Sequence, residues 1–199
     1  MNTGLERYSF RLNLKSELAK RLVLQLNTSY SQTEQKQTSH SQSSSMNQMV
    51  RRILTTKPTL MPGDQIYEDE NVEYVPADNP YIMATELKDI LQQRFFILNA
   101  SLTYNFGKGL SWKGAGSFNR TDGSRSTYYP IGTNAGNSAH GMAFRGEDNR
   151  QNIVLETTVN YDRKFKKHHH INAVLGYTHE DRQRKTLAIQ VGDFAGNDL

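Results

Sequence analysis

The chain has 199 residues, of which 36% are hydrophobic and 22% charged, and its formal net charge is +4. Its Lys and Arg residues are spread over many segments rather than gathered in one stripe, so we expect no binding to nucleic acid. The absence of cysteine excludes disulfide bonds and thiolate metal sites. No apolar run reaches about 18 residues, which excludes a transmembrane helix. The first ten residues also lack the basic start and apolar stretch of a signal peptide.

Apolar and polar residues alternate twice near the start of the chain. Over residues 8–16, Tyr, Phe and Leu occupy one set of alternate positions, and Ser, Arg, Asn and Lys occupy the other. A period of two is the signature of a β-strand. The alternation resumes over residues 22–31 after a short charged segment. The sequence therefore predicts an antiparallel hairpin over about residues 8–31.

The same alternation returns twice further along the chain. It flanks the sequence GKG at residues 107–109, which predicts a second hairpin over about residues 94–119. It also flanks a basic segment that contains three consecutive histidines, which predicts a third hairpin over about residues 153–180. Each of the three hairpins is closed at one end by a short charged or glycine-rich turn.

Two long polar segments separate the hairpins. They cover about residues 32–93 and 120–151, far more than the usual connection of about four to six residues. All five prolines fall in these segments and none in an expected strand, as sheet hydrogen bonding requires. We therefore predict long loops at the end of the sheet opposite the short turns.

The length of the expected strands points to a membrane barrel. They run to about ten residues, which is enough to cross a bilayer at a tilt of about 45°. A sheet in lipid has to close on itself, because unpaired edge groups would find no partner there. Short turns at one end and long loops at the other are typical of outer-membrane barrels. The fold class expected is all-β: an antiparallel up-and-down meander of about six long strands of a transmembrane β-barrel with long external loops.

This fold class assigns roles to the apolar and aromatic side chains of the expected strands. The residues expected to face the membrane are Phe10, Leu12, Leu14, Leu22, Leu24, Leu26, Phe96, Leu98, Leu102, Leu155, Val159 and Leu175. The aromatic residues expected at the membrane interfaces are Tyr8, Tyr30, Tyr104, Trp112, Phe118, Tyr161 and Tyr177. The alternative is a soluble β-rich binding or structural module without catalysis, whose sheet would also alternate between apolar and polar residues.

Several stretches together resemble a known family. They are "RYSFRLNLKSELAKRLVLQLNTSYS", a loop with "MVRRILTTKPTLMP" and "NPY", then "FFILNASLTYNFGKGLSWKGAGSFN" and "HHHINAVLGYTHED". The chain resembles the SusC/RagA family of TonB-linked outer-membrane receptors of Bacteroidetes. That resemblance implies a barrel of 22 strands with an N-terminal plug, a SusD-like lipoprotein as lid, and import of glycans or peptides with energy from TonB. It also implies a location in the outer membrane of a Gram-negative cell.

Parts of that family pattern are not visible in this sequence. We find no plug domain and no segment that would contact TonB. We therefore expect residues 1–199 to be an internal segment of the barrel domain, which would reach the TonB complex only through a missing N-terminal part.

No motif of covalent catalysis is present, so we expect no enzyme activity and no cofactor. We also expect no metal site, since the three histidines read as a solvated turn and the acidic residues near position 68 as an exposed loop. Residues that would contact a ligand or the lid are expected in the external loops, where aromatic faces stack on sugars and anchor interfaces. They are Tyr67, Tyr74, Tyr81, Tyr128, Tyr129, Phe144, Arg51 and Arg52.

Overall fold

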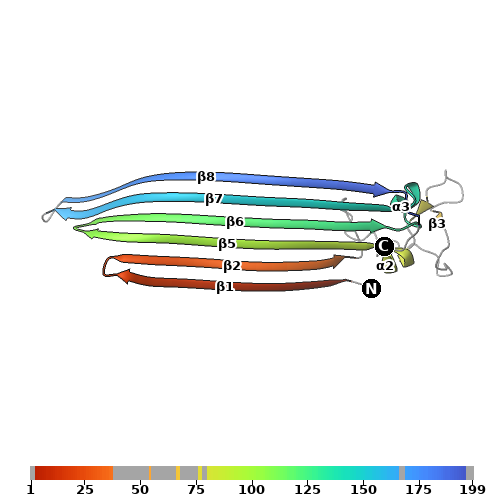
Figure 1. Ribbon diagram of the computed structural model, residues 1–199, viewed down its shortest axis with the longest axis horizontal. Helices are drawn as coiled ribbons and strands as arrows, with labels where there is room; N and C mark the ends of the chain where they lie inside the picture. The colour runs from red at the N-terminus through yellow and green to blue at the C-terminus, as the bar shows by residue number, and fades with distance from the viewer. Residues whose placement is uncertain are drawn as a thin grey trace.

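The computed structural model describes residues 3–37, 54, 66–67, 76–77, 80–165 and 169–195. Six long antiparallel strands form one sheet: β1 (Gly4–Ala19), β2 (Leu22–Gln37), β5 (Lys88–Gly107), β6 (Leu110–Tyr129), β7 (Met142–Phe165) and β8 (His169–Gly192). Their order in the sheet is the order in the chain, with β1 and β8 as open edges within the described part (Figure 1). This confirms the predicted all-β up-and-down meander; the sheet is not closed.

Short turns lie at one end of the sheet (Figure 1). Lys20 and Arg21 connect β1 to β2, and Lys108 and Gly109 connect β5 to β6. Lys108 and Gly109 have φ values of 53° and +88°, in the left-handed region that favours glycine. A Cβ atom on Gly109 would collide with the backbone carbonyl oxygen of Asp162. The GKG sequence therefore supplies both the backbone conformation and the space that this turn requires.

The longer connections lie at the opposite end (Figure 1). Between β2 and β5 the chain forms a two-stranded pair, β3 (Ile66–Tyr67) with β4 (Pro76–Ala77), and the short helix α2 (Pro80–Thr85). Between β6 and β7 it forms the short helix α3 (Asn134–Ser138). Within the described ranges, no helix has the length and apolar character needed to cross a membrane.

The small apolar core lies at this same end. Among the residues that the structure describes, the buried apolar side chains include Ile82 and Met83 of α2, Leu87, Tyr128 and Pro130. A Cβ atom on Gly132, which has a φ of +103°, would collide with the side chain of Ile82. The absence of a side chain at Gly132 thus lets α2 pack against the segment that follows β6. The long middle of the sheet carries no such second layer in the described residues.

The strands are longer than the sequence pattern predicts. Expected at about ten residues, they run from 16 to 24. The predicted loop 120–151 was wrong in extent, because β6 continues to Tyr129 and β7 starts at Met142. The predicted loop 32–93 is shortened at both ends in the same way. Backbone pairing continues where both faces of the strands become polar, and hydrophobic alternation gives no signal there.

Candidate functional site

The register between strands divides the side chains of the sheet into two faces. We call one the apolar face, after a cross-strand row that contains Leu14, Leu26, Ala100, Gly116 and Leu155. We call the other the polar face, after the adjacent row that contains Asn13, Asn27, Asn99, Ser117 and Val154. Successive residues of a strand point to opposite faces, so these two rows are representative of the rest.

All residues predicted to face the membrane or its interfaces share the apolar face. They are Phe10, Leu12, Leu14, Leu22, Leu24, Leu26, Phe96, Leu98, Leu102, Leu155, Val159 and Leu175, with the aromatic residues Tyr8, Tyr30, Tyr104, Trp112, Phe118, Tyr161 and Tyr177. Phe10 is 61% exposed and Leu175 is 76% exposed. An apolar face this large is unusual on a soluble monomer. Its contact with lipid stays a prediction.

The apolar face carries a continuous band of uncharged side chains. The apolar band consists of the apolar-face positions within residues 8–14, 22–30, 96–104, 110–118, 153–161 and 171–177. These positions hold Leu, Ile, Val, Phe, Tyr, Trp, Ala, Gly and Thr. The next apolar-face residue above the band, toward the end with the helices, is polar on every strand: Glu6, Gln32, Arg94, Arg120, Gln151 and His179.

The band crosses the strands at an angle. The cross-strand row that starts at Tyr8, the upper border on β1, reaches Lys185 on β8. The upper border on β8 is Tyr177, about eight residues nearer the turn than Lys185. The upper border of the band is thus displaced by about eight residues along the strand direction over the five steps from β1 to β8. With a rise of about 3.4 Å per residue and about 4.8 Å between strands, this displacement corresponds to an angle of about 45° between the border and the cross-strand rows. The band can therefore lie parallel to a membrane plane only if the strands are tilted by about that angle from the membrane normal.

Aromatic side chains line both borders of the band. Phe96 and Phe118 lie side by side at the upper border, with ring centroids 6.0 Å apart. Near the lower border, the ring of Trp112 covers Gly114, where an added Cβ atom would lie 2.9 Å from the indole. The Trp112 Nε1 donates a hydrogen bond of 2.8 Å to the Thr157 hydroxyl on β7. The glycine thus leaves room for the indole to lie along the sheet and join two strands.

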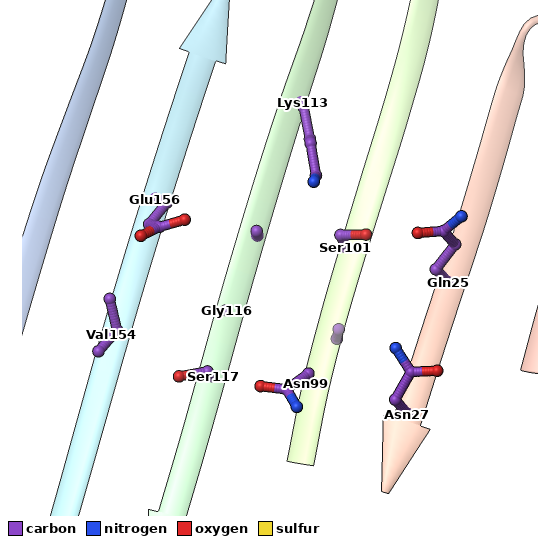
Figure 2. Close-up of a pocket in the computed structure, with 11 residues that line it drawn as sticks. Gln25, Asn27, Asn99, Ser101, Lys113, Gly116, Ser117, Val154 and Glu156 are labelled. Carbon is purple, nitrogen blue, oxygen red and sulfur yellow. The ribbon is translucent and has the colours of Figure 1, made fainter. Parts of the chain in front are cut away.

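The polar face carries a hollow of about 380 Å³ at its centre. Gln25 and Asn27 on β2, with Asn99 and Ser101 on β5, line one side of it (Figure 2). Lys113, Ser117 and Glu156 on β6 and β7 are among the residues on the other side. Amides and hydroxyls both donate and accept hydrogen bonds. The hollow therefore offers neutral hydrogen-bonding groups together with one cation and one anion.

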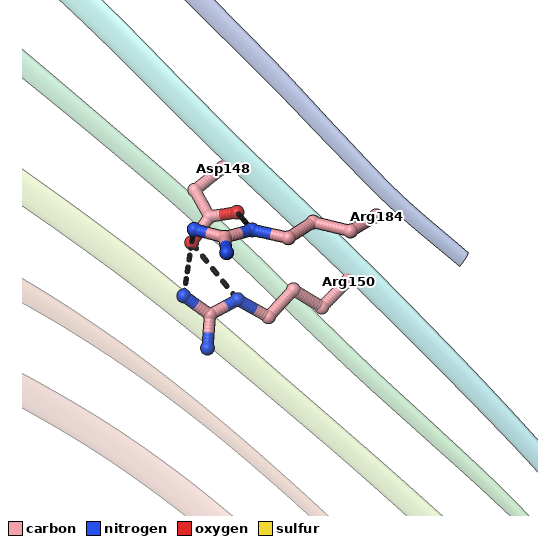
Figure 3. Close-up of polar contacts among 3 residues, drawn as sticks. All are labelled: Asp148, Arg150 and Arg184. Atoms are coloured by element: carbon pink, nitrogen blue, oxygen red, sulfur yellow. Dashed lines mark hydrogen bonds and ion pairs between the residues drawn. The ribbon is translucent and has the colours of Figure 1, made fainter. Parts of the chain in front are cut away.

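Beyond the upper border of the band, the polar face carries an ion cluster. Asp148 accepts hydrogen bonds from Arg150, with Nη2 to Oδ2 at 2.5 Å, and from Arg184, with Nε to Oδ1 at 2.8 Å (Figure 3). The hydrogen bond from Arg150, followed by that from Arg184, lowers the pKa of Asp148 to about 2. Two guanidinium groups share one carboxylate, so the cluster keeps a net positive charge at neutral pH.

A second ion pair, near α2, is shielded from solvent. The Asp89 side chain is fully buried, and it accepts hydrogen bonds from Arg125 Nε at 2.8 Å and Arg125 Nη2 at 2.5 Å. The Thr127 hydroxyl also donates to Asp89, at 3.3 Å. The hydrogen bond to Asp89 raises the pKa of Arg125. This two-pronged geometry is the strong form of an arginine–carboxylate contact, and it joins the start of β5 to the end of β6.

The structure describes only some of the residues expected to contact a ligand or lid, and it places them on several elements. Tyr81 on α2 is 51% exposed. Tyr128 and Tyr129 end β6, and Phe144 lies on β7, so their predicted place in a loop was wrong. Tyr128 is buried and packs edge-on against Phe194 at 5.8 Å. The backbone of Tyr67 belongs to β3, while Tyr74, Arg51 and Arg52 lie outside the described residues.

Sequence reasoning missed the charged groups above the band. Opposite charges two residues apart, as in Arg145 with Glu147 and Asp148 with Arg150, lie on the same side of a strand and pair there. That spacing is a sequence signal for strands whose two faces are both polar. Among the residues that the structure describes, no three His, Asp or Glu side chains come together as a metal site.

Comparisons with known structures relate the fold to the RagAB peptide transporter. No protein-family model and no curated protein matches the chain. A structure of the RagAB peptide transporter superposes with a TM-score of 0.71 at 17% identity, over 94% of this chain and 21% of that chain. The RagAB peptide importer matches in its closed-closed state (TM-score 0.66, 15% identity, 99% and 22% coverage) and open-open state (0.71, 17%, 99% and 22%). At these identities the likeness shows a shared fold, and the chain spans about a fifth of the length of those proteins.

Proposed function

We propose that this chain is a segment of the barrel wall of a TonB-dependent transporter of the SusC/RagA type in the outer membrane of a Gram-negative cell. The tilted apolar band is the observation that carries the proposal. Transmembrane barrel strands are tilted by about 35 to 45° and present an apolar band about 25 Å tall. On four of the six strands the band covers nine residues, which span about 27 Å along the strand and about 20 Å along the barrel axis between Cα atoms. The border side chains extend it further.

The absence of charge within the band supports lipid contact. A charged side chain on the lipid face costs about 2 to 4 kcal/mol at the bilayer midplane, and none of the band positions carries one. In the described part of the chain, no second sheet or helix covers these side chains, which favours the membrane over a soluble module. In this proposal the edges of β1 and β8 pair with further strands of a closed barrel, since lipid leaves edge groups unsatisfied.

The polar face then lines the interior of the barrel. Its amides and hydroxyls suit the peptide groups or sugar hydroxyls of a cargo, or of a plug domain, because each of these offers hydrogen-bond donors and acceptors. The transporter would import peptides or glycans without covalent chemistry. A SusD-like lipoprotein would close the end that carries α2 and α3, and the TonB complex would act through a part of the protein outside residues 1–199. The RagAB likeness supports peptides as the first class to test.

The test of this proposal uses Trp112, the only tryptophan of the chain. The full chain is folded into vesicles of dioleoyl phosphatidylcholine or of its dibromostearoyl counterpart, whose bromine atoms quench nearby indoles. We expect strong quenching of Trp112 in the brominated vesicles. A matched variant with Trp112→Phe and Ser117→Trp moves the indole to the polar face and should be quenched far less. Equal emission of Trp112 in both kinds of vesicle would refute lipid contact.

A further inference from the structure

Two arginines stand on the apolar face directly above the band. Arg94 is the next apolar-face residue above Phe96 on β5. Arg120 is the next apolar-face residue above Phe118 on β6. Arg94 lies opposite Asp122, and Phe96 lies opposite Arg120. The two arginines are therefore diagonal neighbours, with Cα atoms about 7 to 8 Å apart. Both are exposed.

These guanidinium groups have unused hydrogen-bonding capacity. Arg120 donates its Nε to both carboxylate oxygens of Asp122, at 3.1 and 2.9 Å. Its terminal nitrogens have no partner within the described residues, and Arg94 has no hydrogen bond or ion pair there. One carboxylate faces two cations, so the pair keeps a net positive charge. Below it, the adjacent rings of Phe96 and Phe118 form an apolar surface.

We propose that Arg94 and Arg120 bind the phosphate of an anionic lipid in the outer leaflet, whose acyl chain lies on Phe96 and Phe118. The inference rests on the proposed function, because only a membrane places phosphate at that height beside an apolar band. Guanidinium groups bind phosphate through two parallel hydrogen bonds. Aromatic residues at the border mark the headgroup level of such barrels. The site thus matches an amphiphile, with cations for its headgroup and rings for its tail.

The tilt of the strands supplies a matched control on the same face. Lys185 shares a cross-strand row with Arg94 and is also exposed. It lies about eight residues above Tyr177, which at a tilt of about 45° is about 19 Å above the border, whereas Arg94 is about 5 Å above it. Lys185 should therefore stand clear of the phosphates. If the strands were not tilted, Lys185 and Arg94 would lie at the same height relative to the membrane, because they share a cross-strand row.

The experiment measures lipid binding to the full chain in neutral detergent micelles. The probes are diphosphoryl lipid A and the same lipid after removal of its phosphates, and native mass spectrometry counts the lipid molecules retained. We expect R94Q/R120Q to weaken binding of the phosphorylated lipid by about tenfold or more, which is the effect of losing one charge-assisted hydrogen bond. K185Q should change binding by less than about twofold, since its charge lies beyond the headgroups. The dephosphorylated lipid should bind the wild type and R94Q/R120Q equally weakly.

Three outcomes would overturn the site. The first is equal retention of the phosphorylated lipid by the wild type and by R94Q/R120Q. The second is a loss of lipid binding in K185Q as large as that in R94Q/R120Q. The third is displacement of the lipid by millimolar inorganic phosphate, which would indicate a site for free phosphate. Quenching of Trp112 by brominated lipid separates this failure from failure of the proposed function. If brominated lipid still quenches Trp112 but lipid binding does not depend on the two arginines, only the proposed phosphate site is rejected. Loss of quenching in the wild type removes the membrane assignment itself.

Discussion

The substitution Leu26→Arg tests the position of the membrane on this sheet. Leu26 lies in the middle of the apolar band on β2, four residues below Tyr30 at the upper border. That separation is about 14 Å along the strand and about 10 Å in depth at a tilt of about 45°. An arginine at this depth should destabilise the folded state by about 2 to 4 kcal/mol, because its charge leaves water for hydrocarbon.

Two controls separate depth from the chemistry of the substitution. Leu187 is on the apolar face of β8, about ten residues above Tyr177, which is about 24 Å above the border. Leu187→Arg should therefore cost at most about 1 kcal/mol. Asn27→Arg places the same charge next to Leu26 in sequence but on the polar face, where water or polar groups surround it. We expect this variant to stay within about 0.5 kcal/mol of the wild type.

The assay is reversible urea unfolding of the chain in phospholipid vesicles, followed by the emission of Trp112. The free energy of unfolding of each variant is compared with that of the wild type under the same lipid conditions. The reasoning fails if Leu187→Arg destabilises the protein as much as Leu26→Arg does. It also fails if Leu26→Arg and Asn27→Arg are equivalent, since the two faces would then not differ in environment.

Three further predictions follow from single contacts. Gly114→Ala should displace the Trp112 indole, because the new Cβ would lie 2.9 Å from the ring; a changed emission maximum checks this, and an unchanged spectrum would contradict it. Asp89→Asn should lower the stability of the end that carries α2 by about 1 to 3 kcal/mol, since a buried charged acceptor for Arg125 is lost; faster hydrogen exchange of the α2 amides is the measurement. Because the pKa of Asp148 is lowered to about 2, its ion cluster should contribute fully above the unfolded pKa of about 3.9 and be lost as the pH falls through about 2; a carboxylate midpoint near 4 in an NMR titration would refute this.

Hydrophobic alternation located the part of each strand within the apolar band and missed the part above it. On β7, the pattern starts at Ile153 whereas the strand starts at Met142. Over residues 145–152 neither face carries an apolar side chain, so a period of two in hydrophobicity is absent there. The remaining signs of a strand there are pairs of opposite charges two residues apart. Arg145 Nη2 donates a hydrogen bond to Glu147 Oε1 at 3.0 Å, and Arg150 pairs with Asp148 in the same way. Charge spacing therefore extends the prediction where hydropathy ends.

The polar contacts near α2 depend on pairing between distant segments. Asp89 and Arg125 are 36 residues apart, and only the register of β5 with β6 brings their side chains together. The burial of Tyr128 likewise depends on Phe194, which follows the last strand. No local pattern encodes such neighbours, so aromatic residues that were expected to be free for a ligand proved to be part of strands or of the core.

The sequence by itself determined the two faces of the sheet and the pairing of strands within each hairpin. Side chains alternate along any extended strand, and short turns force neighbouring strands to pair, so both properties follow from local pattern. The angle at which the apolar band crosses the strands was decided only by the tertiary structure. It depends on how far each strand is shifted along its neighbour, and that shift is set by hydrogen bonds between segments far apart in the chain.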